Sequence, residues 1–145
     1  MRKLIFLSFL SILTIFASEY ELEMNRGIFS YYFGYDSSES QYVTNLKGKI
    51  FKSEYIDVAI EMGFFDTEHR SDIGLVFEKE FFEILAVGLE FGNSYVNKEA
   101  LGMVGLRIGY IMPFTMSVFS INYLYREYGY GNPYSKSILS LGIRF

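Results

Sequence analysis

The chain has 145 residues and a formal net charge of −4, and hydrophobic residues make up 50% of it, with 19% aromatic. This length indicates one domain, and the apolar content is high for a soluble one. The sequence contains no cysteine, which excludes disulfides and thiolate metal sites. Because no stretch of the chain is strongly cationic, nucleic acid is not an expected partner.

The first 17 residues have the layout of a secretory signal peptide. Arg2 and Lys3 precede an apolar run from Leu4 to Phe16, which ends at the small residues Ala17 and Ser18. A run of about 13 residues is shorter than the ~20 that a helix needs to span a bilayer. We therefore predict a signal peptide over residues 1–17 and an exported domain over residues 18–145. The alternative is an uncleaved membrane anchor.

The rest of the chain alternates apolar and polar residues with a period of two, which indicates strands, and no window has the period of a helix. Tight or polar breaks separate the strands, and Pro113 and Pro133 fall in these breaks, as their missing backbone donor requires. The breaks after the odd-numbered strands tend to be longer, as outer loops are in transmembrane barrels. The predicted strands are residues 25–35, 42–51, 55–65, 73–78, 85–96, 100–111, 115–125 and 135–145.

The two faces of these strands differ in charge. Within the predicted bounds, the apolar face carries no Asp, Glu, Lys or Arg, as hydrocarbon requires, because Arg or Lys at the bilayer midplane costs about 2–4 kcal/mol. We therefore expect the apolar face to contact lipid and the other face to line the interior. The charged residues of that other face are Arg26, Lys47, Lys49, Asp57, Glu61, Glu78, Glu90, Arg107, Lys136 and Arg144.

The interior charges are expected to pair with one another, since an isolated buried ion is very costly. Glycines flank Glu90 and Arg107, and a turn around Lys98 and Glu99 would make these two residues direct cross-strand neighbours, so we predict that they pair. An eight-stranded barrel leaves little lumen, which favours a plug over an ion path. The predicted network is Lys47, Lys49, Asp57, Glu61, Glu78, Glu90 and Arg107.

Aromatic residues gather toward the ends of the predicted strands, as interfacial girdles do. The alternative is that Tyr and Phe are simply good strand formers. The set predicted for one end is Tyr35, Tyr42, Phe64, Tyr95, Tyr123 and Tyr125, and the set for the other end is Phe82, Tyr110, Phe114 and Phe145.

The chain offers little that could support catalysis. Its single histidine, His69, lies in a polar segment and could act as a base for Ser71 or Ser94 only if the fold positioned them together. A polar loop is the simpler interpretation. We predict no catalytic residues, no metal site and no cofactor.

The last strand ends in S-K-S-I-L-S-L-G-I-R-F, with Leu139, Leu141, Ile143 and Phe145 on one face. This pattern resembles the C-terminal signal of bacterial outer-membrane β-barrel proteins, which implies recognition by the barrel-assembly machinery. The whole chain resembles the small OmpA-like and OmpX-like barrels. That resemblance implies an all-β fold, a closed eight-stranded antiparallel up-and-down transmembrane β-barrel in the bacterial outer membrane, surrounded by its lipid.

The same resemblance implies a structural, adhesion or surface-interaction role, with at most a narrow pore and a possible surface ligand at the loops. Two other functions stay open at this point. A soluble exported lipocalin-like barrel would have the two faces exchanged and would bind an apolar ligand inside. A lipid A-modifying outer-membrane enzyme would use His69.

Overall fold

The structure, a computed structural model, describes residues 28–67, 69–112, 118–129 and 134–145. The predicted signal peptide and residues 113–117 and 130–133, with both prolines, lie outside this part of the chain, as do Arg26 and Phe114. The strands are β1 (Phe29–Asp36), β2 (Gln41–Phe51), β3 (Asp57–Phe65), β4 (Arg70–Phe81), β5 (Leu85–Val96), β6 (Glu99–Ile111), β7 (Phe119–Tyr128) and β8 (Tyr134–Arg144).

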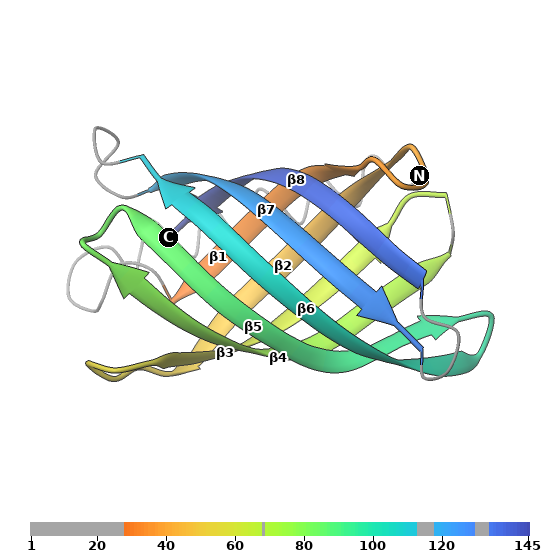
Figure 1. Cartoon of the computed structure of the whole chain (residues 1–145), viewed down its shortest axis with the longest axis horizontal. Coiled ribbons are helices and arrows are strands. Elements are labelled where there is room, and N and C mark those ends of the chain that lie inside the picture. Colours follow the sequence, from red (N-terminus) through yellow and green to blue (C-terminus); the bar gives the residue numbers. More distant parts are fainter. Residues whose placement is uncertain (1–27, 68, 113–117, 130–133) are drawn as a thin grey trace.

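The eight strands form a closed antiparallel barrel in which each strand pairs with the next one along the chain and β8 pairs with β1 (Figure 1). Backbone hydrogen bonds of 3.0–3.1 Å in both directions join Phe29 to Phe145 where the barrel closes. The predicted fold class, an all-β barrel of eight antiparallel up-and-down strands, is therefore confirmed. Within the described residues, no helix is long and apolar enough to cross a bilayer.

We call the end of the barrel that holds Phe29 and Phe145 the terminal end, and the opposite end the loop end. The loop end carries the connections 37–40, 66–69, 97–98 and 129–133, and the terminal end carries 52–56, 82–84 and 112–118. The predicted difference in length is wrong, because the connection between β6 and β7 is longer than any at the loop end. The strands run almost to the tips of the hairpins, so the polar segments expected to be loops are partly strand.

In two hairpins, two consecutive non-glycine residues have positive φ. Asn97 and Lys98, with φ of 49° and 70°, form the two-residue turn between β5 and β6. Phe82 and Glu83, with φ of 54° and 58°, connect β4 to β5. Positive φ at both central positions matches the right-handed twist of paired strands. The first of these turns fixes the β5–β6 register, with Val96 opposite Glu99.

Over most of the length of the strands, alternate residues point inward and are buried, while their neighbours point outward and are more exposed. This is the pattern that a period of two requires in a closed barrel. Where β8 pairs with β1, the ring of Tyr32 lies close to the backbone of Gly142, and a Cβ on Gly142 would lie 2.6 Å from that ring. Gly142 therefore makes room for an inward-pointing aromatic ring.

Candidate functional site: the charged interior

Among the described residues, the interior contains as many positively as negatively charged side chains. They come from all eight strands, and most of them are buried. The cations are Lys47, Lys49, Arg70, Arg107, Arg126, Lys136 and Arg144, and the carboxylates are Asp36, Asp57, Glu61, Asp72, Glu78, Glu80 and Glu90.

Arg126, near the end of β7, is fully buried and is the centre of the network. Its guanidinium donates two hydrogen bonds to Glu90, from Nε to Oε2 at 2.9 Å and from Nη2 to Oε1 at 2.7 Å. Nη1 donates to Asp72 at 3.1 Å and Nη2 to Glu61 at 3.0 Å. The Tyr128 hydroxyl donates to the same Asp72 oxygen at 2.6 Å. One planar donor group thus joins carboxylates from three strands, a geometry that Arg can provide and Lys cannot.

A second group of charges surrounds the ring of Tyr32. Arg107 donates to Glu61, and its guanidinium carbon lies 4.5 Å from the centroid of the Tyr32 ring. Lys47 lies 5.3 Å from the same ring and donates to Glu78 at 2.6 Å. The ring provides favourable cation–π contacts to both cations, which supplement their ion pairs. Glu61 joins this group to Arg126, so the two groups form one continuous network.

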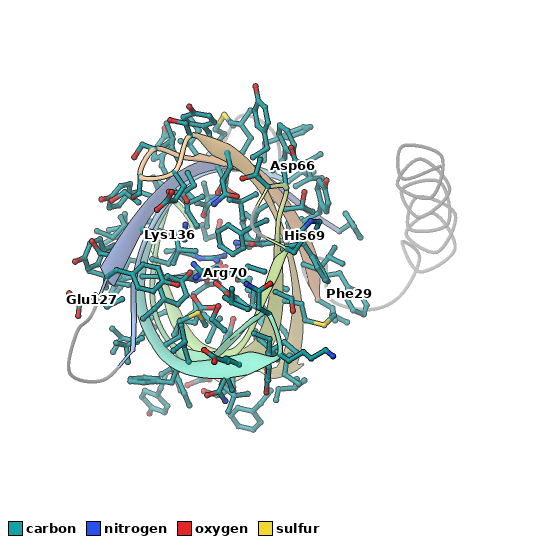
Figure 2. The ribbon with its side chains drawn as sticks, turned by 90° about the vertical axis from the view of Figure 1, so that its right-hand side faces the viewer. Phe29, Asp66, His69, Arg70, Glu127 and Lys136 are labelled. Carbon is teal, nitrogen blue, oxygen red and sulfur yellow. The ribbon has the colours of Figure 1, made fainter. Side chains whose placement is uncertain are left out.

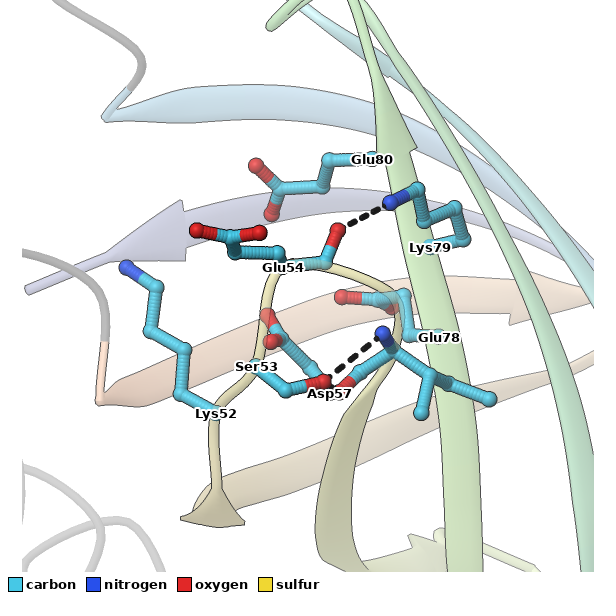
Figure 3. Close-up of a pocket in the computed structure, with 8 residues that line it drawn as sticks. Lys52, Ser53, Glu54, Asp57, Glu78, Lys79 and Glu80 are labelled. Carbon is cyan, nitrogen blue, oxygen red and sulfur yellow. Dashed lines mark hydrogen bonds between the residues drawn. The ribbon is translucent and has the colours of Figure 1, made fainter.

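At the terminal end the charges are paired but partly open to solvent. Lys49 donates to Asp57 at 2.8 Å and lies 3.5 Å from Glu80, which also accepts from Arg144. A small cavity of about 130 Å³ opens beside these groups, between the β2–β3 turn and the end of β4 (Figure 3). It is lined by Lys52, Ser53, Glu54, Ile56, Asp57, Glu78, Lys79 and Glu80.

At the loop end, Arg70 is enclosed by aromatic rings. Its guanidinium carbon lies 4.8 Å from the ring centroid of Tyr128, 4.9 Å from that of Tyr134 and 5.7 Å from that of Phe65. The rings of Tyr128 and Tyr134 are stacked, with centroids 5.1 Å apart. We call Arg70 and these three rings the clasp. Figure 2, which looks into the loop end, shows Arg70 in the opening of the barrel.

Beside the clasp, Lys136 is fully buried, donates to Asp36 at 2.9 Å and lies 5.3 Å from the Phe65 ring (Figure 2). Asp36 also accepts from the Gln41 amide at 3.2 Å, and Gln41 in turn accepts from the Thr67 hydroxyl at 2.7 Å. These bonds connect the β1–β2 and β3–β4 hairpins to Lys136 of β8. The interior is therefore occupied by side chains from one end to the other.

The structure places all seven residues of the predicted network inside the barrel, each in an ion pair. The predicted pairing of Glu90 with Arg107 is wrong. Glu90 lies opposite Gly105 and Arg107 opposite Gly88, because the turn is centred on Asn97 and Lys98 rather than one residue later.

Sequence reasoning missed several members of the network. Arg126, the centre of the network, lies one residue beyond the predicted strand 115–125, and Asp36, Arg70 and Asp72 fall in predicted loops but lie in strands. A signal was available, since Asp72 has the same parity as Gly74 and Val76 on β4. A polar residue at a strand end is no evidence for a loop when the interior itself is polar.

The outer face is apolar over most of its height. Phe33, Leu89, Phe91 and Leu141 retain between 47% and 61% of their accessible surface. Because the strands are longer than predicted, two charged residues, Lys79 and Glu127, also occupy outward positions, both close to strand ends. The expectation of an outer face without any charge is thus correct only between these ends. Figure 2 shows Glu127 on the outside of the barrel.

Aromatic side chains lie on the outer face toward both ends of the wall. Near the loop end, Tyr42 stacks on Phe33 with ring centroids 5.5 Å apart and meets Tyr35 edge-on at 5.6 Å. At the terminal end, Phe82 is 92% exposed at the tip of its turn. Leu139, Leu141 and Ile143 of β8 also point outward, opposite residues of β1 and β7.

The two serines considered as partners of His69 lie on opposite faces of the barrel wall. Ser71 faces outward on β4, whereas Ser94 is buried on the inner side of β5, opposite Asp72. His69 lies in the connection between β3 and β4, with a φ of 48°. Among the described residues, no three His, Asp or Glu side chains are grouped so as to hold a metal ion.

The barrel resembles solved transmembrane barrels in fold. The outer-membrane protein Ail of Yersinia pestis, determined in a phospholipid bilayer nanodisc, aligns with a TM-score of 0.61 and 13% identity, over 82% of this chain and 99% of Ail. A de novo designed transmembrane β-barrel aligns with a TM-score of 0.58 and 13% identity, over 86% of this chain and all of the design. Neither a protein-family model nor a curated protein matches the sequence.

Proposed function

We propose that the protein is an integral barrel of the bacterial outer membrane, with a structural or surface-interaction role and an interior closed by its charge network. The observation that supports this most strongly is the separation of side chains between the two faces of the wall. Large apolar residues are exposed on the outside, and charged residues are buried inside. Lipid stabilises that arrangement and water does not.

The interior supports a plug rather than a wide pore. Arg126, Tyr128, Lys47 and Lys136 are among the largest fully buried side chains and fill the barrel along its length. A lipocalin-like function would need an apolar cavity in this place. The charges found there do not suit an apolar ligand, so this alternative receives no support.

The connections at the loop end are short, which limits the area that a surface ligand could contact there. The described parts offer Glu39, Asp66, Lys98 and Glu99 on exposed positions. We propose that a surface ligand, if bound, contacts these tips and the adjacent aromatic residues rather than an extended loop. Substituting Lys98 and Glu99 together should then abolish binding of such a ligand without changing the fold, and unchanged binding would contradict this.

The outward row of Leu139, Leu141 and Ile143, ending at Phe145, supports recognition of β8 by the barrel-assembly machinery. Because β8 also closes the barrel against β1, this strand must be free when it is recognised. Removing Phe145 should reduce the amount of protein assembled in cells but still allow refolding of the purified chain. Equal assembly with and without Phe145 would contradict the proposed recognition.

The lipid-facing assignment can be tested at Leu89, which is 50% exposed at the middle of β5, opposite the outward residues Phe77 and Leu106. Leu89→Arg should prevent membrane assembly, because an Arg near the midplane costs about 2–4 kcal/mol. Leu89→Phe is the matched control and should assemble normally. Normal assembly of Leu89→Arg would contradict the proposed membrane placement.

A further inference from the structure

The two ends of the barrel differ in how far solvent reaches the inward charges. At the terminal end, the side chains of Asp57 and Arg144 retain 12% and 18% of their accessible surface, and Glu80 retains 25%. At the loop end, the side chains of Lys136 and Asp36 retain none. The inward charges near the strand ends are thus more exposed to solvent at the terminal end than at the loop end.

The clasp accounts for the closure of the loop end. Arg70 is only 7% exposed although it is the first residue of β4, because rings from β3, β7 and β8 surround its guanidinium. Tyr128 is itself fully buried and is held by its hydrogen bond to Asp72. At the rim of the terminal end, Lys49 and Arg144 contact carboxylates, and the Tyr32 ring contacts Lys47 and Arg107 further inside.

An apolar cluster continues the closure inward on the side of the barrel formed by β2, β3, β7 and β8. In this cluster, Phe65 of the clasp packs with three other inward-facing residues, all at most 2% exposed. Water does not fill a packed apolar cluster, and ions passing through it would lose their hydration. The three residues are Val43, Leu124 and Ile138.

We propose that water and small polar solutes reach the inward charges from the terminal end only, and that the clasp and the apolar cluster beneath it close the loop end. The terminal end is then a blind vestibule, whose inner limit is the packed charge network. Its charges equilibrate with the compartment at that end and are shielded from the compartment at the loop end. Placement in a membrane does not by itself determine which end of the folded barrel admits solvent. We expect the same end to admit solvent in micelles and in a bilayer.

The absence of native cysteine allows single thiols to report solvent access. Ser94 is 0% exposed and lies two residues before Val96, the partner of Arg70, so Ser94→Cys places a thiol just inside the clasp. Ser30 is 3% exposed and lies opposite Arg144, so Ser30→Cys places a thiol near the terminal end at matched burial. Each variant is first shown to migrate as a compact, heat-sensitive band in micelles.

The expected result is that a small water-soluble methanethiosulfonate modifies Ser30→Cys at least about tenfold faster than Ser94→Cys. Adding Tyr134→Ala, which removes the outermost ring of the clasp, should accelerate modification of Ser94→Cys by about tenfold, the factor that a loss of about 1.4 kcal/mol produces. The same substitution should leave the rate at Ser30→Cys unchanged.

Three results would overturn the proposal. Equal rates at the two thiols would show that the loop end is open. An unreactive Ser30→Cys would show that the terminal end does not admit solutes. A Ser94→Cys rate that Tyr134→Ala does not change would show that the clasp is not the closure.

Discussion

Replacing Arg126 by Met should be among the most damaging single substitutions in the barrel. The substitution removes four hydrogen bonds to three carboxylates. Asp72 keeps the Tyr128 hydroxyl and Glu61 keeps Arg107, but Glu90, which is 1% exposed, loses both of its bonds to Arg126. Breaking a buried pair in this way costs about 3–5 kcal/mol, because an unpaired charge stays behind.

The assay is urea unfolding in lipid vesicles under conditions where folding is reversible. Because most of the cost falls on Glu90, Glu90→Gln in the Arg126→Met background should recover about 1–2 kcal/mol of the free energy of unfolding. A matched control is Lys98→Met in the exposed β5–β6 turn, which should change stability by less than about 0.5 kcal/mol. A loss of under 1 kcal/mol for Arg126→Met would refute the central role of Arg126.

A double-mutant cycle also tests the observed register. Glu90 and Arg126 are in direct contact, so their coupling free energy should be about 2 kcal/mol. Glu90 and Arg107 are linked only through Glu61 and Arg126, so their coupling should be less than half as large. A larger coupling free energy for Glu90 with Arg107 than for Glu90 with Arg126 would indicate that Glu90 pairs directly with Arg107, and would contradict the structure.

Two further predictions concern the backbone. Gly142→Val should destabilise the barrel by about 1–3 kcal/mol in urea unfolding, because its Cβ would lie 2.6 Å from the Tyr32 ring. Adding Tyr32→Ala to the same chain should relieve part of this loss. An unchanged urea midpoint for Gly142→Val would count against this contact. Asn97→Val should cost about 1–2 kcal/mol, because a β-branched residue tolerates the positive φ of 49° poorly, while Asn97→Gly should be nearly neutral. Equal stability of these two variants would mean that the turn is formed differently.

The direction of the side chains could be predicted from the sequence, and their partners could not. A period of two assigns Glu61 inward and Leu89 outward wherever a strand is recognised, and the structure agrees. Pairing depends on where each hairpin turns, and a turn displaced by one residue shifts the cross-strand partner by two. The position of the β5–β6 turn decided that Glu90 meets Arg126 rather than Arg107.

The ends of the strands could not be predicted from the sequence either. In a soluble protein, the polar residues around Asp36 and Arg70 would indicate loops, because the interior there is apolar. In this barrel they are strand residues, and inside it Asp36 pairs with Lys136 and Arg70 contacts the ring of Tyr128. The clasp could not be foreseen either, because Phe65, Arg70, Tyr128 and Tyr134 belong to four strands and only the closure of the barrel brings them together.

Whether the apolar outer face requires lipid can be tested by refolding the purified chain from residue 18 onward, with and without detergent micelles, followed by gel migration before and after boiling. We expect a compact, heat-sensitive band only when micelles are present, because the apolar outer face needs an apolar surrounding. A folded, monodisperse, water-soluble monomer in plain buffer would contradict the assignment of that face to lipid.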